Sequence, residues 1–198
     1  MRIFLETDRL TLRRFTEADE ENLFELNSDP EVMRFLTGGK PTPRDQVRAA
    51  IIPVFLGYYE RFEGFGFWAA VETATTQFLG WFHFRPPLRD EGTAAGWDEE
   101  GVAELGYRLR RSAWGKGYAT EGSRALIGKG FTEFGVRRVV AETMAGNWGS
   151  RRVLEKSGLI QVGTFASAEP DPVGSTAQGN VVYELTRADW AARAQRLT

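Results

Sequence analysis

The sequence predicts an α/β or α+β sandwich, in which helices are interleaved with and cover one mixed sheet. Two observations lead to this prediction. Segments with strand-like and helix-like spacing follow one another in the order strand, helices, three strands, helix, strand, helix, two strands. No internal repeat or linker interrupts the 198 residues, a length that one domain accommodates. We therefore expect a single domain over residues 1–198.

The first half is expected to hold one strand, several helices and a hairpin. In "RLTLRRF", Leu10 and Leu12 alternate with polar residues as in a half-buried strand, and Thr16 is placed to cap a helix with an acidic first turn. Helical spacing resumes over residues 44–62, where we expect Pro53 to kink the helix or mark its boundary. The apolar runs "GFGFWAAVET" and "FLGWFHF" flank the polar turn "ATTQ" and predict an antiparallel hairpin.

The second half alternates strands with helices. "VAELGYRL", "RRVVAET", "LIQVGTF" and "VVYELTR" have the composition of strands. Residues 118–134 show a helical apolar stripe, and Gly135 is placed to end that helix; "SRRVLEKSG" predicts a shorter one. Two loops separate these elements. Residues 86–101 carry an excess of acidic side chains, and residues 166–180 are rich in Gly, Pro and Ser.

Composition excludes several classes of chemistry. The net charge of −2 argues against a general nucleic-acid binder. The absence of cysteine excludes disulfides, thiolate metal sites and a cysteine nucleophile, and the single histidine, His83, argues against a histidine-rich metal site or a Ser-His-Asp triad. The N-terminus lacks the apolar core of a signal peptide, and the longest apolar run is too short to span a bilayer. We expect a cytoplasmic protein with no metal and no membrane partner.

The segment "WGKGYAT" lies between the strand that ends near Leu109 and the helix that begins near Tyr118. Glycines allow close approach of a ligand, and the first N–H groups of a helix receive phosphates well. Lys116 would add a positive charge, but the Gly117 that follows it rules out a Walker loop. From spacing alone, an anion site and a simple change of chain direction are equal alternatives.

Three ordered segments make the prediction more specific: "ETDRLTLRRFTEADEENLFELNSDPEVMRFL", "ELGYRLRRSAWGKGYATE" and "AGNWGSRRVLEKSGL". Together they resemble GNAT-superfamily N-acetyltransferases of the RimJ/RimL type, which acetylate ribosomal-protein N-termini. The resemblance covers about residues 6–190 and is weakest in the two long loops. Gly117 and Ala119 match the family's Q/R-x-x-G-x-G/A loop, whereas Trp114 replaces its usual Gln or Arg.

The resemblance implies the GNAT fold, with a central mixed, mostly antiparallel sheet of about seven strands. It implies helices on both faces of this sheet and a splay between strands 4 and 5. It also implies acetyl-CoA as co-substrate, direct attack by the amine in a ternary complex, and no metal. The residues expected to bind acetyl-CoA are Leu109, Arg110, Gly115, Lys116, Gly117, Tyr118, Ala119, Thr120, Asn147 and Ser150.

Two residues are candidates for the acid and base chemistry. Glu104 lies in the strand before the loop and is our candidate base, acting through water; the alternative is an exposed strand glutamate paired with Arg108 or a neighbour. Asn147 and Ser150 match the family's N-x-x-S helix start, and Ser150 is our candidate acid; the alternative is that both residues only cap the helix. Leu154 stands where many members carry a tyrosine, so that phenol is missing.

Other polar residues have structural alternatives. We expect Glu121 of "YATE" to have a structural role, and His83 to be either a packed core residue or a cleft residue. The acidic loop 86–101, with Glu169 and Asp171, would attract a cationic amine if it faces the cleft.

The leading hypothesis is transfer of acetyl to a primary amine, preferably a protein N-terminal α-amine. A small cationic amine such as a polyamine or aminoglycoside is the rival acceptor. A catalytically silent acyl-CoA-binding module is the alternative from another class. The sequence leaves the oligomeric state open, a homodimer included.

Overall fold

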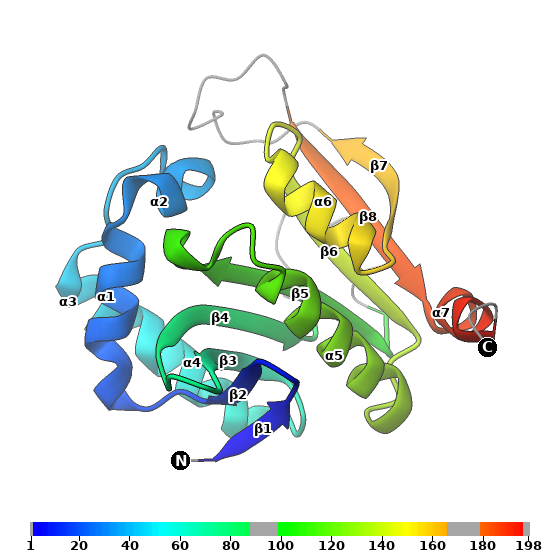
Figure 1. Cartoon of the computed structure of the whole chain (residues 1–198), viewed down its shortest axis with the longest axis horizontal. Helices are drawn as coiled ribbons and strands as arrows, with labels where there is room; N and C mark the ends of the chain where they lie inside the picture. Colours follow the sequence, from blue (N-terminus) through cyan, green and yellow to red (C-terminus); the bar gives the residue numbers. More distant parts are fainter. Residues whose placement is uncertain (1, 88–98, 166–178, 196–198) are drawn as a thin grey trace.

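The computed structural model describes residues 2–87, 99–165 and 179–195. A sheet of eight strands runs through this part, in the order β1-β2-β3-β4-β5-β6-β8-β7 (Figure 1). The strands are β1 (Ile3–Glu6), β2 (Leu10–Arg14), β3 (Gly66–Glu72), β4 (Phe78–Arg85), β5 (Val102–Leu109), β6 (Arg138–Met144), β7 (Ile160–Phe165) and β8 (Asn180–Thr186). All neighbouring pairs are antiparallel except β5 and β6, which are parallel.

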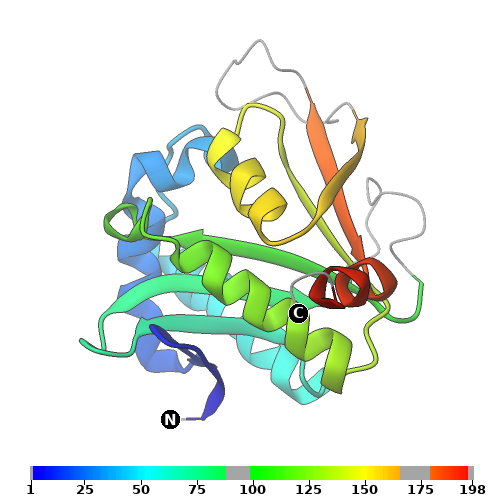
Figure 2. The same cartoon turned by 45° about the vertical axis from the view of Figure 1, so that its right-hand side comes forward.

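Helices cover both faces of this sheet, as expected (Figure 2). The α-helices are α1 (Glu20–Ser28), α2 (Pro30–Thr37), α3 (Arg44–Gln46), α4 (Ile52–Arg61), α5 (Tyr118–Glu133), α6 (Trp148–Lys156) and α7 (Arg187–Gln195). The shorter turns are η1 (Glu17–Asp19), η2 (Val47–Ile51) and η3 (Arg111–Ala113). We call the side covered by α5 and α6 the α5/α6 face, and the opposite side the α1–α4 face.

The sequence prediction missed the first and the last element of the described chain, β1 and α7. β1 is a short edge strand in the charged N-terminal segment, and its pairing with β2 is irregular between Ile3 and Leu5. α7 follows β8 directly, its start is capped by Thr186 and Asp189, and Trp190 packs on Phe131 of α5. Both elements are short and weakly patterned, so tertiary packing decides them.

The structure shows the predicted helix start at Thr16 and the position of Pro53 within its helical segment. Thr16 forms a capping box with Asp19, as expected of an N-cap. The helical segment from α3 through η2 to α4 continues past Pro53, which lies at the start of α4. The one π-helical turn in the described residues, η2, directly precedes that proline. Pro53 therefore marks a boundary within the segment, because it has no N–H to donate to the preceding turn.

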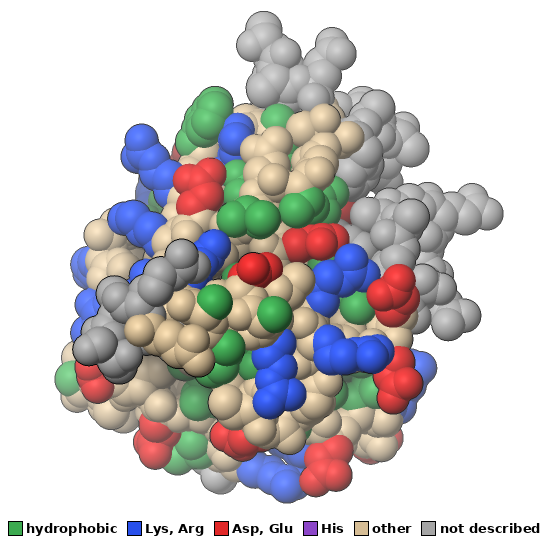
Figure 3. Space-filling view, turned by 90° about the vertical axis from the view of Figure 1, so that its right-hand side faces the viewer, with side chains coloured by type: hydrophobic (Ala, Val, Ile, Leu, Met, Phe, Trp, Pro, Cys, Tyr) green, Lys and Arg blue, Asp and Glu red, His purple; other side chains and the backbone are tan. Residues whose placement is uncertain are grey.

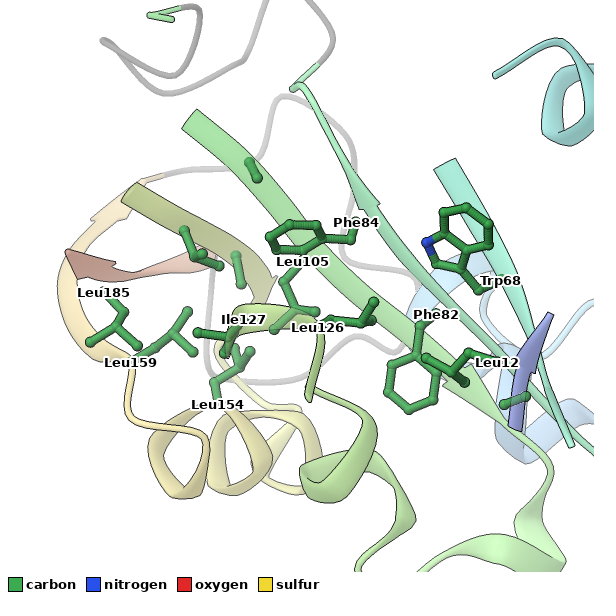
Figure 4. Close-up of a cluster of buried hydrophobic side chains, with 14 of the residues drawn as sticks. Leu12, Trp68, Phe82, Phe84, Leu105, Leu126, Ile127, Leu154, Leu159 and Leu185 are labelled. Atoms are coloured by element: carbon green, nitrogen blue, oxygen red, sulfur yellow. The ribbon is translucent and has the colours of Figure 1, made fainter. Parts of the chain in front are cut away.

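Each face of the sheet has its own buried cluster. On the α5/α6 face, side chains from β2, β3, β4 and β5 pack against α5 and α6 (Figure 4). This cluster includes Trp68, Phe82, Leu105, Leu126 and Leu154, each at most 2% exposed. On the α1–α4 face, aromatic side chains of β3 and β4 pack against α1, η2 and α4. Leu105 and Leu109 lie in the first cluster, which turns Glu104, Gly106 and Arg108 to the α1–α4 face, as the alternation in the sequence predicted.

The expected splay lies between β5 and β6, which are the fifth and sixth strands because of β1. Val102, Ala103 and Glu104 pair with β6, and the pairing then stops. β5 continues to Leu109 paired only with β4, and β6 continues to Met144 paired only with β8. A gap with unpaired backbone edges opens beyond Glu104.

The outer surface carries charges of both signs. On the side shown in Figure 3, basic and acidic side chains of the described residues are interspersed. Among the described helices, none has the length and apolar character needed to cross a membrane.

The buried ion pair between Arg13 and Asp19 gives a stability prediction. Burial by itself would raise the pKa of Asp19, but hydrogen bonds from Arg13 and Thr16 lower it below its ordinary value of 3.8. The stability from this ionised group is therefore present above about pH 4 and is lost as pH falls through the lowered pKa. We expect Asp19→Asn to reduce the free energy of unfolding by about 3 kcal/mol at pH 7, because Arg13 remains buried without its partner.

Urea unfolding between pH 3 and pH 7 measures this effect. The loss caused by Asp19→Asn should shrink toward pH 3. Glu31→Gln, which removes an exposed pair with Arg34, is the control and should change little. A loss independent of pH would contradict the ion-pair explanation.

Candidate active site

The gap between β5 and β6 exposes backbone groups of β5. The Arg110 N–H donates to the Leu79 carbonyl at 2.7 Å, so Arg110 is paired with the beginning of β4. Because such pairs alternate along an antiparallel ladder, Tyr107 and Leu109 direct their N–H and C=O groups toward the gap. The indole N–H of Trp114 donates to the Leu109 carbonyl at 2.8 Å, which agrees with this orientation. The N–H groups of Tyr107 and Leu109 are thus in place to meet an extended ligand.

The glycine loop ends at a helix start with free donors. Gly115 and Gly117 have φ of 73° and 85°, the left-handed region that glycine adopts without strain. The first backbone hydrogen bond within α5 runs from the Glu121 N–H to the Gly117 carbonyl at 3.0 Å. The N–H groups of residues 118–120 therefore have no acceptor within the helix and form an anion-binding end.

Glu121 fixes this loop to the β1–β2 turn. Its carboxylate accepts hydrogen bonds from Thr7 Oγ1 at 2.6 Å, from the Arg9 N–H at 3.0 Å and from Arg9 Nε at 2.7 Å. Arg9 Nη1 in turn donates to the Lys116 carbonyl at 2.9 Å. Glu121 therefore has the structural contacts that the sequence analysis expected of it.

Two of the residues expected to bind acetyl-CoA can contribute less than their position suggests. The Tyr118 ring is buried in the α5/α6 core and its hydroxyl donates to Glu72, so its backbone is the part that faces the loop. The Arg110 N–H is used by Leu79, and its guanidinium pairs with Glu25 of α1 at 2.7 Å. The backbone N–H groups of the loop are therefore the hydrogen-bond donors that remain for the ligand.

The start of α6 lies across the α5/α6 face from this loop. Asn147 Oδ1 accepts from the Ser150 N–H at 3.2 Å, which is a helix cap and occupies one side of the Asn147 amide. The Tyr107 hydroxyl lies 3.0 Å from the Ser150 carbonyl and 3.1 Å from Ser150 Oγ. Burial raises the pKa of Tyr107, so this phenol keeps its proton. Tyr107 on β5 thus places a phenol beside Ser150. The position at which many family members carry a tyrosine is occupied here by Leu154.

Glu104 lies on the α1–α4 face with two basic neighbours. Arg85 Nη2 is 2.7 Å from its carboxylate, and His83 Nε2 is 3.5 Å away. Gly106 makes room for the His83 ring, because a Cβ there would lie 2.5 Å from the imidazole. Burial raises the pKa of Glu104, but His83 and Arg85 outweigh it, and the pKa is below its ordinary value of 4.5. The ion-pair partner of Glu104 is thus the neighbouring Arg85, whereas Arg108 contacts Asn27.

A second carboxylate on this face was not singled out from the sequence. Glu142 lies two residues beyond Val140, the last β6 residue paired with β5. Although Glu142 stays accessible to solvent, packing around its carboxyl raises its pKa above 4.5, and the charge of Glu104 adds to this rise. Asn180 donates a hydrogen bond to Glu142, which opposes the rise but does not cancel it. The alternation in "RRVVAET" places Glu142 on one face, but only the pairing register places it beside Glu104.

Most of the acidic loop and both acids of the last loop lie outside the described residues. Within the described part, Glu99 pairs with Arg138 at 3.4 Å, and Arg137 donates to the Glu100 carbonyl. The described residues contain no group of three or more His, Asp or Glu side chains that could hold a metal ion.

Comparison with known proteins agrees with this geometry. The family described as "Acetyltransferase (GNAT) domain" matches residues 9–160. An FsC-acetyl coenzyme A-N(2)-transacetylase of Aspergillus fumigatus is 32% identical over 186 residues, which are 94% of this chain and 77% of that protein. The chain belongs to the GNAT family and is an acetyl-CoA-dependent N-acetyltransferase.

Solved structures show the same fold at lower identity. An acetyltransferase of the GNAT family from Bacillus anthracis has a TM-score of 0.74 and 23% identity, and covers 95% of this chain and 99% of its own. A RimL ribosomal L7/L12 α-N-protein acetyltransferase in complex with coenzyme A has a TM-score of 0.74 and 17% identity, with 93% and 98% covered.

The loop geometry yields a binding prediction. Gly117→Asp places a side chain at a φ of 85° and a negative charge beside the free N–H groups of α5. We expect CoA affinity to fall at least about tenfold, because a strained backbone and charge repulsion act together. Isothermal titration with CoA measures this change. Gly57→Asp, where a Cβ would meet nothing within 4 Å, is the control, and equal affinities in both variants would contradict the loop assignment.

Proposed function

We propose that this N-acetyltransferase acetylates a primary amine, with a protein N-terminal α-amine as the preferred acceptor. The observation that supports acetyl transfer at this site is the open gap between β5 and β6, with helix-start donors on one face and two carboxylates on the other. The preference for a protein N-terminus rests on the three sequence segments that resemble RimJ/RimL-type enzymes.

In the proposed complex, acetyl-CoA lies along the α5/α6 face and the gap. The pyrophosphate binds the N–H groups of residues 115–120, with Lys116 adding positive charge. The pantetheine passes the start of α6 near Asn147 and follows the free edge of β5. The Leu109 N–H is available to the thioester carbonyl and to the oxyanion that develops there. The amine then approaches from the α1–α4 face.

We assign the base role to the pair of carboxylates on that face. Glu104 is ionised at neutral pH and is held by Arg85 and His83, so it is a weak proton acceptor by itself. Glu142 has a raised pKa and no ion-pair partner among the described residues, which suits it better to accept a proton. Glu142, directly or through water, removes a proton from the ammonium; packing around its carboxyl, with a contribution from the fixed charge of Glu104, keeps the pKa of Glu142 raised.

The leaving group needs a proton on the other face. The amine lone pair attacks the thioester carbon, and the attacking nitrogen gives its second proton to water as the amide forms. The C–S bond breaks, and the thiolate takes the hydroxyl proton of Ser150. Tyr107 lies 3.1 Å from Ser150 Oγ and can hand its own proton to that oxygen as the hydroxyl proton leaves. Ser150 and Tyr107 regain this proton from water after the products leave. This arrangement keeps the functions of base and acid on opposite faces of β5.

A small amine is the second candidate acceptor. It is supported by the Aspergillus fumigatus relative, whose name describes acetyl transfer to an N(2) position of FsC.

Acetyl-CoA turnover with a panel of acceptors tests the proposal. We expect peptides with a free N-terminus to react faster than the same peptides with a blocked N-terminus, and faster than spermidine or an aminoglycoside. Thiol release measures the rate, and mass spectrometry locates the acetyl group. Faster turnover of a small amine would favour the second candidate. CoA binding without acetylation of any amine would support the silent module.

The two carboxylates predict different pH profiles. A base must be deprotonated, so activity should rise as pH passes the raised pKa of Glu142 and then level off, apart from the titration of the acceptor amine. We expect Glu142→Gln to lower kcat about 100-fold or more and to remove this acidic limb. Glu104→Gln should lower kcat less and move the limb to lower pH, because it removes a negative neighbour.

Steady-state kinetics between pH 5 and pH 9 measure both effects. Glu133→Gln, an exposed glutamate at the end of α5, is the control. If Glu104→Gln alone removed the acidic limb, the base would be Glu104.

A further inference from the structure

Arg108 is a largely buried guanidinium whose charge has no partner of opposite sign among the described residues. Its Nη1 donates to Asn27 Oδ1 at 2.5 Å, and its Nε is enclosed without any hydrogen-bond partner. Its guanidinium lies 5.0 Å from the centre of the Trp81 ring. Burial lowers the pKa of Arg108 to about 10, which shows that its surroundings disfavour the charged form.

Arg110 and Arg111, which follow Arg108 in the chain, lie next to carboxylates, whereas Arg108 lies next to an amide. Glu25 of α1 pairs with Arg110 at 2.7 Å, and Asp29 at the end of α1 lies 3.5 Å from Arg111. Between them, the buried Asn27 meets Arg108 with a neutral oxygen. An uncompensated buried charge is costly unless something pairs with it. Arg108 is therefore held in place by the fold but left without the anion that would satisfy it.

The position of Arg108 indicates which substrate would bring that anion. It lies on the α1–α4 face of β5, four residues along the strand from Glu104, which corresponds to about 13 Å between the two Cα atoms. The loop and the start of α6 lie on the opposite face, so acetyl-CoA occupies that side. In the proposed complex, the acceptor is therefore the substrate on the same face as Arg108.

We propose that Arg108 binds a carboxylate of the acceptor, so that the preferred substrates are amines that carry a carboxylate several bonds away from the reacting nitrogen. This inference rests on the proposed function and specifies its substrate class. The carboxylate would belong either to a small amino acid or to an acidic side chain near a peptide N-terminus. A terminal nitrogen of the guanidinium donates to it, while Asn27 keeps the side chain in position.

Matched acceptors test this inference. The first pair is 6-aminohexanoate and its carboxamide, and the second is a peptide with Glu or Gln at its second position. We expect wild-type kcat/KM to favour the carboxylate at least about tenfold in one of the pairs, and the pair that shows the preference identifies the source of the carboxylate. Arg108→Gln should reduce this preference to about twofold or less while retaining turnover of the neutral acceptor. Arg34→Gln, an exposed arginine of α2, is the control.

Asn27→Asp provides an independent test. It places a carboxylate beside Arg108 permanently, so it should also abolish the preference while raising the thermal unfolding temperature. If Arg108 has only a structural role, both acceptors of each pair should react equally with the wild type, and Arg108→Gln should only lower stability. That result would overturn the inference. If succinyl-CoA were preferred to acetyl-CoA in an Arg108-dependent way, the carboxylate would belong to the acyl donor, and the assignment to the acceptor would be wrong.

The failure of this inference can be separated from failure of the proposed function. Turnover of the neutral acceptors reports the proposed function without any contribution from Arg108. Thermal stabilisation by each acceptor in the presence of CoA reports binding without any chemistry. If the carboxylate acceptors stabilise the wild type more than the neutral ones, and Arg108→Gln removes the difference, the inference holds even where no amine is acetylated. Equal stabilisation by both members of each pair would count against it.

Discussion

The parting of β5 and β6 is the constraint on which the rest of this structure depends. The two strands pair over three residues and then separate, after which β5 stays paired with β4 from Glu104 to Leu109 and β6 stays paired with β8. The backbone groups that a continuous sheet would satisfy are left free for a ligand. The gap also connects the two faces of the sheet at one place. In the proposed complex, the acyl group meets the amine there. Every residue assigned a role in the reaction lies at the border of this gap or at a helix start beside it.

β5 is central to the proposed chemistry because its successive side chains lie on opposite faces of the sheet. Leu105, Tyr107 and Leu109 belong to the α5/α6 face, where Tyr107 reaches Ser150. Glu104, Gly106 and Arg108 belong to the α1–α4 face, where one arginine, one histidine and α1 surround them. In the proposed complex, the strand thus separates the binding of the donor from the binding of the acceptor, because successive side chains lie on opposite faces. The glycine at position 106 matters because the His83 ring occupies the space of its side chain.

Some charged residues on the α1–α4 face have a close ion-pair partner and others have none. We relate this difference to the structural or functional roles proposed for them. Asp19 and Arg13, Glu25 and Arg110, and Glu104 and Arg85 form close pairs. Glu142 and Arg108 have no ion-pair partner within the described residues, and each has a pKa shifted toward its neutral form. Groups kept in this condition cost stability, and strongly shifted pKa values cluster at functional sites, which is the basis of the roles proposed for Glu142 and Arg108.

The sequence alone determined the order of most elements, the hairpin, the face on which Glu104 lies and the glycine loop at the start of α5, because periodicity and turn chemistry depend on neighbouring residues. It also pointed to the GNAT family, which the comparisons confirm. It missed β1 and α7, and it did not identify Arg85 and His83 as the neighbours of Glu104. Only the tertiary structure decided which carboxylate has a raised pKa, that Tyr107 reaches Ser150, and that Arg108 meets an amide. These outcomes depend on pairing register and on helices that pack across the sheet, and residues distant in the chain set them together.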